Sequence, residues 1–271
     1  MKKIDENRRF ANIMQFLPAT AAKVTPRSAG ISTYDEEGVR YLKFGTPWVQ
    51  GAMRVNAPLV LEVEYIQQMM LWTLFMSSPK SICQLGLGAG SLTKFCHKHY
   101  PAAITEVVEI NPDVIEVCRH EFHLPAESST LKVIIEDAED YVAKPGNRGR
   151  YDVLQVDLYD AQAMEPACGS QEFYRDCAAV LNDNGVMTVN LLCEFPAHYD
   201  HFRRMNQVFE AVAWLPEVHD GNKVAIAFKR APVIDFEVLY QRASEIEAQL
   251  DLPARTWVDG LYLWMAEAPF D

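Results

Sequence analysis

The stretch Ser81-Ile82-Cys83-Gln84-Leu85-Gly86-Leu87-Gly88-Ala89-Gly90 joins a short apolar run to three glycines at alternate positions. The run Ser81–Leu85 predicts a buried strand, and the residues after the glycines predict a helix to about Tyr100. Glycines at such a turn allow a tight reversal and a close approach of a ligand to the main chain. The spacing differs from the G-x-G-x-x-G of dinucleotide sites, so a pyrophosphate cofactor is less favoured. By itself, the motif fits a purely structural turn nearly as well.

Strand and helix patterns alternate downstream of these glycines. Asn111 and Pro112 form a well-placed helix start, since Asn is a preferred N-cap and Pro a preferred first helical residue. The alternation predicts an α/β fold: a doubly wound, mostly parallel sheet of the Rossmann-like type, with helices on both faces. The predicted strands are 81–85, 104–110, 131–135, 151–156, 186–192, 213–218 and 223–229, and the predicted helices are 112 onward, 138–143, 171–181 (capped by Ser170, with Asn184-Gly185 as its exit), 197–209 and 234–250.

The region before residue 58 is rich in strand patterns. Gly30–Tyr34 and Val39–Phe44 flank a plausible hairpin turn, and Trp48–Val55 predicts a further strand. Apolar residues at spacings of three and four then predict a helix from Pro58 through about Phe75. These patterns divide the chain into a small β-rich N-terminal domain (1–57), a nucleoside-binding α/β domain (58–230) and a C-terminal helical tail (231–271).

The bulk composition narrows the classes of partner. The chain has 271 residues and a net charge of −12, which argues against a nucleic-acid partner and suits a cationic substrate such as an amine or a sulfonium. The simpler alternative is that the acidic residues only keep the chain soluble and have no role in binding a substrate. The six cysteines form no C-x-x-C pair, and no apolar run is long enough to cross a membrane, so we expect a cytoplasmic protein with free thiols.

Two carboxylates at strand ends are candidates for nucleoside binding. Glu109 ends the second predicted strand of the α/β region, where an acidic residue can accept hydrogen bonds from a ribose diol. Asp137, with the main chain of Ala138, can read the edge of an adenine. The alternatives are a solvated carboxylate at Glu109 and a simple helix N-cap at Asp137.

Asp157 and Asp160 follow the fourth strand of the α/β region, at the position that faces the crevice of a doubly wound sheet. Two carboxylates three residues apart can hold a cationic amine and take its proton. An amine of pKa ~10 is mostly protonated at neutral pH, so a nucleophilic amine needs such a base. The alternative assigns Asp157 to a turn and Asp160 to the surface. Histidine and cysteine residues show no zinc-like spacing, so we expect no metal.

The order and spacing of these motifs resemble the spermidine synthase (polyamine aminopropyltransferase) family. The segments that carry the resemblance are 49–51, 64–65, 86–90, 108–112, 136–138, 151–160, 172–174 and 181–189. The resemblance implies an N-terminal β-domain, a class I methyltransferase-like domain and a homodimer. It also implies an amine that attacks the propyl carbon beside the sulfonium of decarboxylated S-adenosylmethionine.

The resemblance also implies roles for individual residues. Asp157 would be the catalytic base, with Asp160 and Tyr65 near the amine. The cofactor-binding set would comprise Gln50, Gly86, Gly88, Gly90, Glu109 (ribose), Asp137 and Ala138 (adenine).

The chain departs from the family in the half of the site that binds the amine. The family's glycine loop reads G-G-G-D-G, and its aspartate holds the amine of the aminopropyl group, whereas this chain has Ala89. Alanine removes the repulsion that a carboxylate would exert on the carboxylate of intact S-adenosylmethionine. Three functions therefore stay open: aminopropyl transfer, methyl transfer from S-adenosylmethionine, and nucleoside binding without catalysis.

Overall fold

The computed structural model describes residues 25–27, 30–46, 48–159, 169–192, 197–216 and 221–267. Its first sheet is antiparallel in the order β1-β2-β3-β4, which are Thr25–Arg27, Ile31–Glu36, Val39–Phe44 and Val49–Arg54. The predicted hairpin is confirmed, because Glu36 pairs with Val39 around a two-residue turn. Glu37 and Gly38 both have positive φ, as a type I′ turn requires.

The second sheet has seven strands in the order β10-β11-β9-β8-β5-β6-β7. All neighbouring pairs from β9 to β7 are parallel, and β11 and β10 are added antiparallel. The order reverses at β5, which pairs with both β6 and β8, so the crevice of the sheet lies there. The strands are β5 Ser81–Leu85, β6 Ile104–Glu109, β7 Leu131–Ile135, β8 Tyr151–Val156, β9 Leu181–Leu192, β10 Ala211–Trp214 and β11 Asn222–Phe228.

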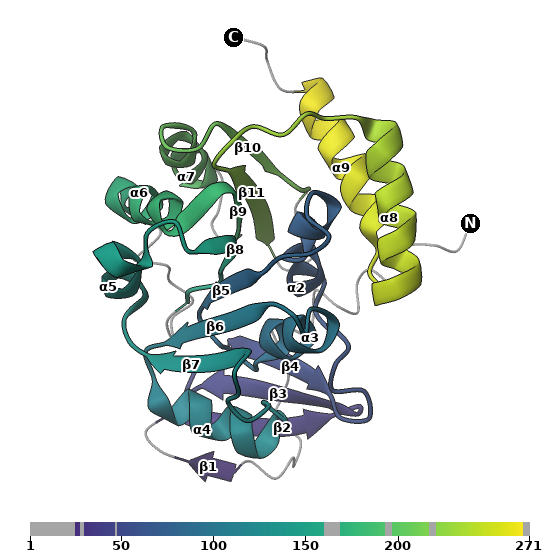
Figure 1. Ribbon diagram of the computed structural model, residues 1–271. Helices are drawn as coiled ribbons and strands as arrows, with labels where there is room; N and C mark the ends of the chain where they lie inside the picture. Colours follow the sequence, from purple (N-terminus) through teal and green to yellow (C-terminus); the bar gives the residue numbers. More distant parts are fainter. Residues whose placement is uncertain are drawn as a thin grey trace, which may run out of the picture.

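Helices cover both faces of this sheet, as the sequence predicts (Figure 1). One face packs against α5 Ala138–Ala143, α6 Gln171–Val180 and α7 Ala197–Asn206. The other packs against α2 Glu64–Gln68, the 3₁₀ turn η1 Leu71–Leu74, α3 Ser91–His99, α8 Phe236–Leu250 and α9 Ala254–Glu267. The helix α4 Pro112–Glu121 packs with the N-terminal sheet, and a second 3₁₀ turn, η2 Pro145–Asn147, lies between α5 and β8. The expected caps are present, since Asn111 accepts from Asp113 N and Ser170 from Phe173 N, both at 3.0 Å.

The predicted helix from Pro58 to Phe75 is wrong over much of its length. Only α2 and η1 form, and residues 58–63 are not helical. The N-cap position Val63 offers no side-chain acceptor, and Gln67 Nε2 donates to Leu61 O across the expected helix start. Residues 69–72 are buried on all sides, so their apolar spacing reflects insertion into the core rather than one face of a helix.

Several further boundaries differ from the prediction, including β10, which runs over Ala211–Trp214 rather than 213–218, and α7, which ends at Asn206 rather than at residue 209. The helix α6 stops at Val180, and β9 begins at Leu181 rather than at Val186 because Leu181 already pairs with Tyr151. At the C-terminus, the predicted helix is confirmed as α8, but a second helix, α9, follows it. Asp251 ends α8 in the left-handed conformation, and Trp257, Val258 and Leu261 of α9 enter the same apolar cluster as α8. The domain boundaries at residues 57 and 230 stay predictions.

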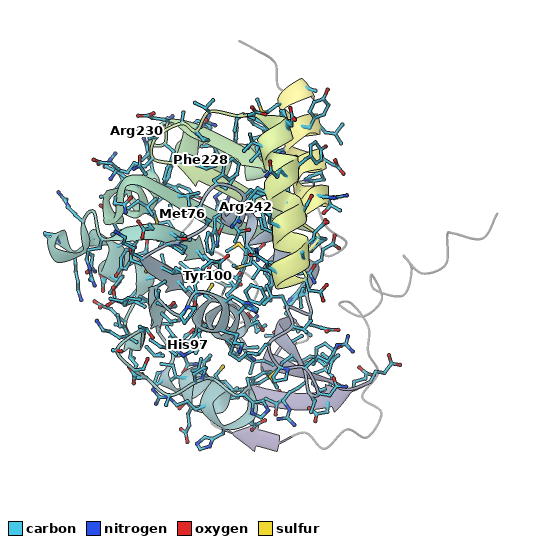
Figure 2. All side chains as sticks on the ribbon, turned by 45° about the vertical axis from the view of Figure 1, so that its right-hand side comes forward. Met76, His97, Tyr100, Phe228, Arg230 and Arg242 are labelled. Carbon is cyan, nitrogen blue, oxygen red and sulfur yellow. The ribbon has the colours of Figure 1, made fainter. Side chains whose placement is uncertain are left out.

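The layer under α8 is built around aromatic side chains. Trp72 of η1 lies with its ring 5.0 Å from that of Tyr100, and the rings of Phe75 and Phe228 are 4.8 Å apart. Arg242 of α8 donates from Nε to Thr73 O at 3.1 Å. Figure 2, with α8 turned forward, labels Tyr100, Met76, Phe228 and Arg242 in this layer. The C-terminal helices are thus attached to η1 by both packing and a hydrogen bond.

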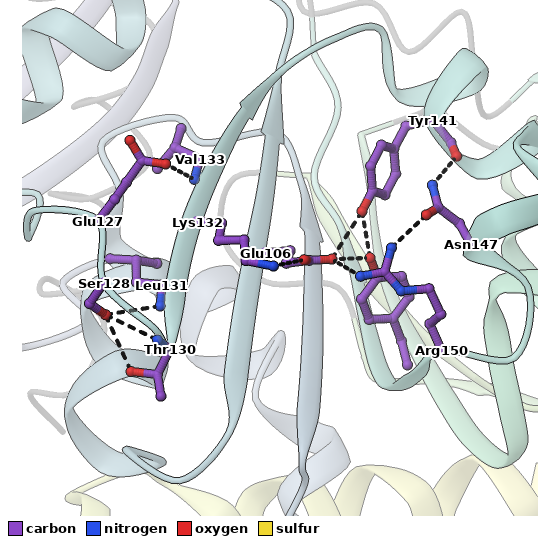
Figure 3. A network of polar contacts seen from close by, with 11 residues as sticks. Glu106, Glu127, Ser128, Thr130, Leu131, Lys132, Val133, Tyr141, Asn147 and Arg150 are labelled. Carbon is purple, nitrogen blue, oxygen red and sulfur yellow. Dashed lines mark hydrogen bonds and ion pairs between the residues drawn. The ribbon is translucent and has the colours of Figure 1, made fainter.

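A buried carboxylate joins four elements on the opposite face (Figure 3). Glu106 of β6 accepts from Lys132 at 3.0 Å, from Arg150 at 2.8 Å and from the hydroxyls of Tyr141 and Tyr151. Burial raises the pKa of Glu106, but Tyr151, Lys132 and Arg150 outweigh burial and hold the pKa below its usual range. Both carboxylate oxygens are paired, so this network fixes β6, β7, β8 and α5 relative to one another.

A buried lysine joins the N-terminal sheet to the larger one. Lys94 of α3 is 1% exposed, and its Nζ donates to Phe122 O at 2.8 Å and lies 3.1 Å from the sulfur of Met53. Ser91 Oγ also donates to Ala52 O, at 3.2 Å. Burial lowers the pKa of Lys94 to about 8. The contact surface between the two sheets therefore contains an amine that titrates near neutral pH.

This amine predicts a pH-dependent stability. The pKa of Lys94 is about 8 in the folded chain against 10.5 for the free side chain, so the folded state binds fewer protons between these pH values. Its contribution to the free energy of unfolding rises through that window, by about 3 kcal/mol. Relative to Lys94→Met, the wild-type protein should gain stability from pH 8 to 10.5 in urea unfolding. Lys98→Met, which removes an exposed lysine of the same helix, should show no such difference, and an equal response of both variants would contradict the assignment.

Candidate functional site

The glycine loop joins β5 to α3 and is shaped by two close main-chain contacts. Gly86 has φ +90°, and a Cβ placed on it would stand 2.2 Å from the carbonyl oxygen of Asp157. Gly88 has φ +50°, and a Cβ there would stand 3.1 Å from Gln50 O. Glycine is therefore required at residue 86 by both conformation and space. The loop follows β5, which pairs with β8, and its residues Gly88 and Ala89 lie against β4.

Glu109 lies against this loop and accepts hydrogen bonds from main-chain N–H groups on either side of it. One carboxylate oxygen accepts from Leu87 N at 3.1 Å and the other from Asn111 N at 2.9 Å. Burial raises the pKa of Glu109, and the main-chain donors Asn111 and Leu87 partly oppose this shift. Each oxygen keeps lone-pair capacity for a further donor. The geometry is compatible with the predicted role in binding a ribose diol, which stays a prediction.

Asp137 lies at the adjacent strand end and caps α5. Its Oδ1 accepts from Glu139 N at 2.7 Å, so the N-cap alternative describes what this side chain does in the structure. Ala138 is buried at the first turn of α5. Within the part of the chain that the structure describes, no hydrogen bond occupies the second carboxylate oxygen of Asp137, which leaves that oxygen open to a ligand. Adenine binding by Asp137 and Ala138 stays a prediction.

Sequence reasoning missed two apolar side chains at this edge. Ile110 follows Glu109 and is 63% exposed, and Ile135, the register partner of Glu109, is 62% exposed. Aliphatic side chains this exposed at the carboxyl ends of two adjacent strands offer a surface to a flat apolar ring. The sequence does contain a signal that could have revealed this surface, because the apolar Ile110 directly follows the strand-end carboxylate of Glu109.

Asp157 is the centre of a polar cluster drawn from three elements. It follows β8, its N–H donates to Leu85 O at 3.0 Å, and its side chain is partly buried. Asn190 of β9 donates to Oδ1 at 2.9 Å, and the Tyr65 hydroxyl of α2 donates to Oδ2 at 3.4 Å. Burial raises the pKa of Asp157, while Asn190 and Tyr65 oppose this shift. A carboxylate with a raised pKa is a stronger base than an exposed one.

Asn190 is a site residue that the sequence did not reveal. It is 2% exposed, and its Oδ1 has no hydrogen-bond partner among the described residues. Tyr159 donates from its hydroxyl to Asn190 O at 2.8 Å. A single asparagine within an apolar strand gives no sequence signal of a site. Asn190 reaches Asp157 only because β9 pairs with β8.

Gln50 and Ala89 lie where β4 crosses the glycine loop. A Cβ on Gly51 would stand 2.6 Å from the Cβ of Ala89, and Ala89 is 3% exposed. The methyl group of Ala89 is therefore packed against β4, and no charged group extends from this position. The main chain of Gln50 lies beside Gly88, and the lining of the cofactor pocket by Gln50 stays a prediction.

Some predicted features lie outside the described residues. Asp160, predicted near the amine, is one of them, as are residues 217–218 at the end of the predicted strand 213–218. Among the described ranges, no group of three or more His, Cys, Asp or Glu side chains could hold a metal ion. The four described cysteines, Cys83, Cys96, Cys118 and Cys177, are buried free thiols.

The seven-stranded sheet, with its glycine loop at the switch point and a carboxylate at the next strand end, defines a class I methyltransferase-like protein. The spermine/spermidine synthase domain profile matches residues 62–233, more than half of the chain. The polyamine aminopropyltransferase of Chromobacterium violaceum is 33% identical over 229 residues, which cover 84% of this chain and 87% of that protein. The chain therefore belongs to the spermine/spermidine synthase family.

Two further similarities place the chain within its fold class. The human eEF1A lysine and N-terminal methyltransferase is 32% identical over 214 residues, covering 69% of this chain but only 28% of that protein. A probable spermidine synthase from Corynebacterium glutamicum has a solved structure with a TM-score of 0.70 at 18% identity, covering 89% of this chain and 95% of that one. At that identity, the structural match shows the shared fold alone.

The contact between Gly86 and Asp157 yields a prediction with a matched control. Gly86→Ala adds a Cβ in a left-handed conformation and against a carbonyl oxygen, whereas Gly38→Ala adds one at φ +80° with nothing within 4 Å. Gly38→Ala should cost about 1–2 kcal/mol of unfolding free energy. Gly86→Ala should cost about 3 kcal/mol or more, since overpacking adds to the strain, and should weaken nucleoside binding. Urea unfolding and calorimetric titration with methylthioadenosine measure both effects, and equal losses in the two variants would refute the contact.

Proposed function

We propose that this protein transfers the aminopropyl group of decarboxylated S-adenosylmethionine to a small amine, as a polyamine aminopropyltransferase. The observation that carries the proposal is the cluster of Asp157, Tyr65 and Asn190 beside the glycine loop. This cluster combines a base of raised pKa with two polar side chains that orient it. Membership of the spermine/spermidine synthase family supports the same reaction.

The residues divide between the two substrates. Glu109 would accept the ribose hydroxyls, Asp137 and Ala138 would contact adenine, and the loop Gly86–Gly90 with Gln50 would enclose the nucleoside. Decarboxylated S-adenosylmethionine supplies an electrophilic carbon bound to a sulfonium. Asp157, with Asp160 and Tyr65, would hold the amine on the other side of that carbon.

The raised pKa of Asp157 has a function in the proton balance of the proposed reaction. An acceptor amine arrives as an ammonium ion and must lose a proton before its nitrogen lone pair can attack. Asp157 accepts that proton, the new carbon–nitrogen bond forms as the carbon–sulfur bond breaks, and neutral methylthioadenosine leaves. Burial raises the pKa of Asp157 and so makes its carboxylate a stronger base, and the hydrogen bond from Asn190 fixes the orientation of the carboxylate.

Methyl transfer from intact S-adenosylmethionine is the second candidate, and Ala89 is the observation that favours it. Its methyl group is buried against Gly51, so the glycine loop presents no carboxylate to repel that of intact S-adenosylmethionine. The similarity to the human eEF1A lysine and N-terminal methyltransferase points the same way. Nucleoside binding without catalysis is the remaining alternative.

The proposal extends to the setting of the reaction. We infer a homodimer in the cytoplasm, on the strength of family membership and of the free thiols. The net charge of −12 supports a cationic small substrate and argues against nucleic acid. No helix within the described ranges is both long and apolar enough to cross a membrane.

Replacing the proposed base should separate chemistry from binding. Asp157→Asn keeps the shape of the side chain and removes the proton acceptor, so kcat should fall by about a hundred- to ten-thousandfold. The wild-type kcat/KM should fall as pH drops through the pKa of Asp157, which burial places above its usual range. The affinity for methylthioadenosine should change little. Asp140→Asn, an exposed carboxylate of α5, serves as the control, and undiminished turnover by Asp157→Asn would remove the base from the proposal.

Ligand preference should separate the candidate functions. We expect calorimetry to show tighter binding of decarboxylated than of intact S-adenosylmethionine, because the intact form would add a carboxylate on the side of the nucleoside where Asp157 is proposed to hold the amine. A preference for the intact form would instead favour methyl transfer. Binding of methylthioadenosine without turnover of any amine would leave a nucleoside-binding protein.

A further inference from the structure

Three adjacent strands carry buried polar side chains in one row. Gln84 of β5 is the register partner of Gln155 of β8, and Gln155 is the partner of Thr188 of β9. All three are at most 2% exposed. The apolar residues beside them point to the opposite face or into the surrounding core, so this row interrupts an otherwise apolar layer. Burying a polar row is costly unless each member is hydrogen-bonded, and a satisfied row stiffens the structure.

Hydrogen bonds connect the row to the segment above it. Thr93 of α3 donates to Gln84 Oε1 at 2.7 Å, and Gln84 Nε2 donates to Gln155 Oε1 at 2.8 Å. Gln155 Nε2 and Thr188 Oγ1 then both donate to Met69 O, each at 3.0 Å. The row therefore ends at a single main-chain carbonyl of a different element, 86 residues from Gln155 in the sequence.

That carbonyl belongs to the residue that ends the helix of Tyr65. Met69 is the C-cap of α2, and its N–H donates to Tyr65 O at 2.8 Å. With five residues and no side-chain N-cap, α2 is too short to be stable by its own hydrogen bonds. Its position must therefore be set by tertiary contacts, which include the two hydrogen bonds that Met69 O accepts from Gln155 and Thr188.

The contacts close into a ring through the proposed base. Gln155 precedes Asp157 by two residues on the same strand side, and Thr188 precedes Asn190 in the same way. From Gln155, the ring runs through Met69 O and α2 to the Tyr65 hydroxyl, which returns to Asp157 Oδ2 at 3.4 Å. The distance from Tyr65 to Asp157 thus depends on how α2 is attached to β8 and β9.

We propose that Gln155 and Thr188 are positioning residues that act through the Met69 carbonyl to hold Tyr65 against Asp157. The proposal deepens the proposed function and rests on it, since Asp157 is taken as the base. Tyr65 donates to the carboxylate and so favours its ionised form. Loosening α2 weakens that donation, and the pKa of Asp157 then rises further.

The test is a double-mutant cycle between Gln155→Met and Tyr65→Phe. Gln155→Met keeps the length of the side chain and removes its hydrogen bonds to Met69 O and Gln84. We expect kcat/KM for the amine to fall about tenfold, with the acidic limb of its pH profile moved to higher pH, as in Tyr65→Phe. In the double variant, the limb should move no further, because both changes remove the same interaction. Additive shifts would overturn the proposal.

A second measurement does not depend on turnover. Hydrogen exchange of the peptide that contains Glu64–Met70 should be faster in Gln155→Met and, to a smaller extent, in Thr188→Val, which removes one of the two bonds and is the milder variant if Gln155→Met does not fold. Tyr141→Phe is the matched control, since it removes a buried hydroxyl from the Glu106 network on the other face. Unchanged exchange in Gln155→Met or Thr188→Val would refute the attachment, even if no amine proves to be a substrate.

Binding provides the last distinction between positioning and general damage. The affinity for methylthioadenosine should stay within about twofold in Gln155→Met, because the described hydrogen bonds of Gln155 go to Gln84, Cys96, Met69 and Met70, none of which is proposed to hold the nucleoside. A loss of nucleoside affinity equal to the loss of kcat/KM would show a collapsed site and overturn the proposal.

Discussion

A Cβ at residue 86 would stand 2.2 Å from the carbonyl oxygen of Asp157, and this close approach of two main chains organises the rest of the molecule. It occurs at the switch point, where β5 pairs with β8 on one side and β6 on the other. Asp157 N also donates to Leu85 O, so the proposed base and the glycine loop share one main-chain scaffold. The N–H of Leu87 in the same loop donates to Glu109. The glycine loop, the main chain of Asp157 and the carboxylate of Glu109 are therefore held in place by main-chain contacts.

The sheet carries a different polar network on each face. Toward α5 and α6, the carboxylate of Glu106 is paired with Lys132, Arg150 and two tyrosines. Toward α2 and α3, neutral amides and hydroxyls form a row that ends at Met69 O. Both networks are buried, and the hydrogen bonds within them are strengthened by their low-dielectric surroundings. The first fixes the strands that end at the proposed nucleoside residues, and the second fixes the segment that supplies Tyr65.

Local signals predicted most of the α/β region. The strands β5 to β8 and the starts of α4 and α6 follow from apolar runs, from Asn111 with Pro112 and from Ser170, all of which act within a few residues. The region before β5 was less predictable. Its residues 69–72 are buried from all sides, and a spacing produced by complete burial resembles that of an amphipathic helix. The second C-terminal helix was missed because its start after Pro253 depends on the turn at Asp251.

The sequence by itself determined the alternation of strands and helices, the glycine loop and the carboxylates Glu109 and Asp157, because each is specified by residue type and short-range spacing. It also left two interpretations of Asp137 open, adenine binding and a helix N-cap, and the structure shows the side chain as an N-cap. Only the tertiary structure decided that Tyr65 and Asn190 meet at Asp157, and that the methyl group of Ala89 packs against Gly51. The contacts at Asp157 join α2 with β8 and β9, and the contact at Ala89 joins the glycine loop with β4. They form only when separate elements pack together, and no short-range pattern encodes which of their side chains will meet.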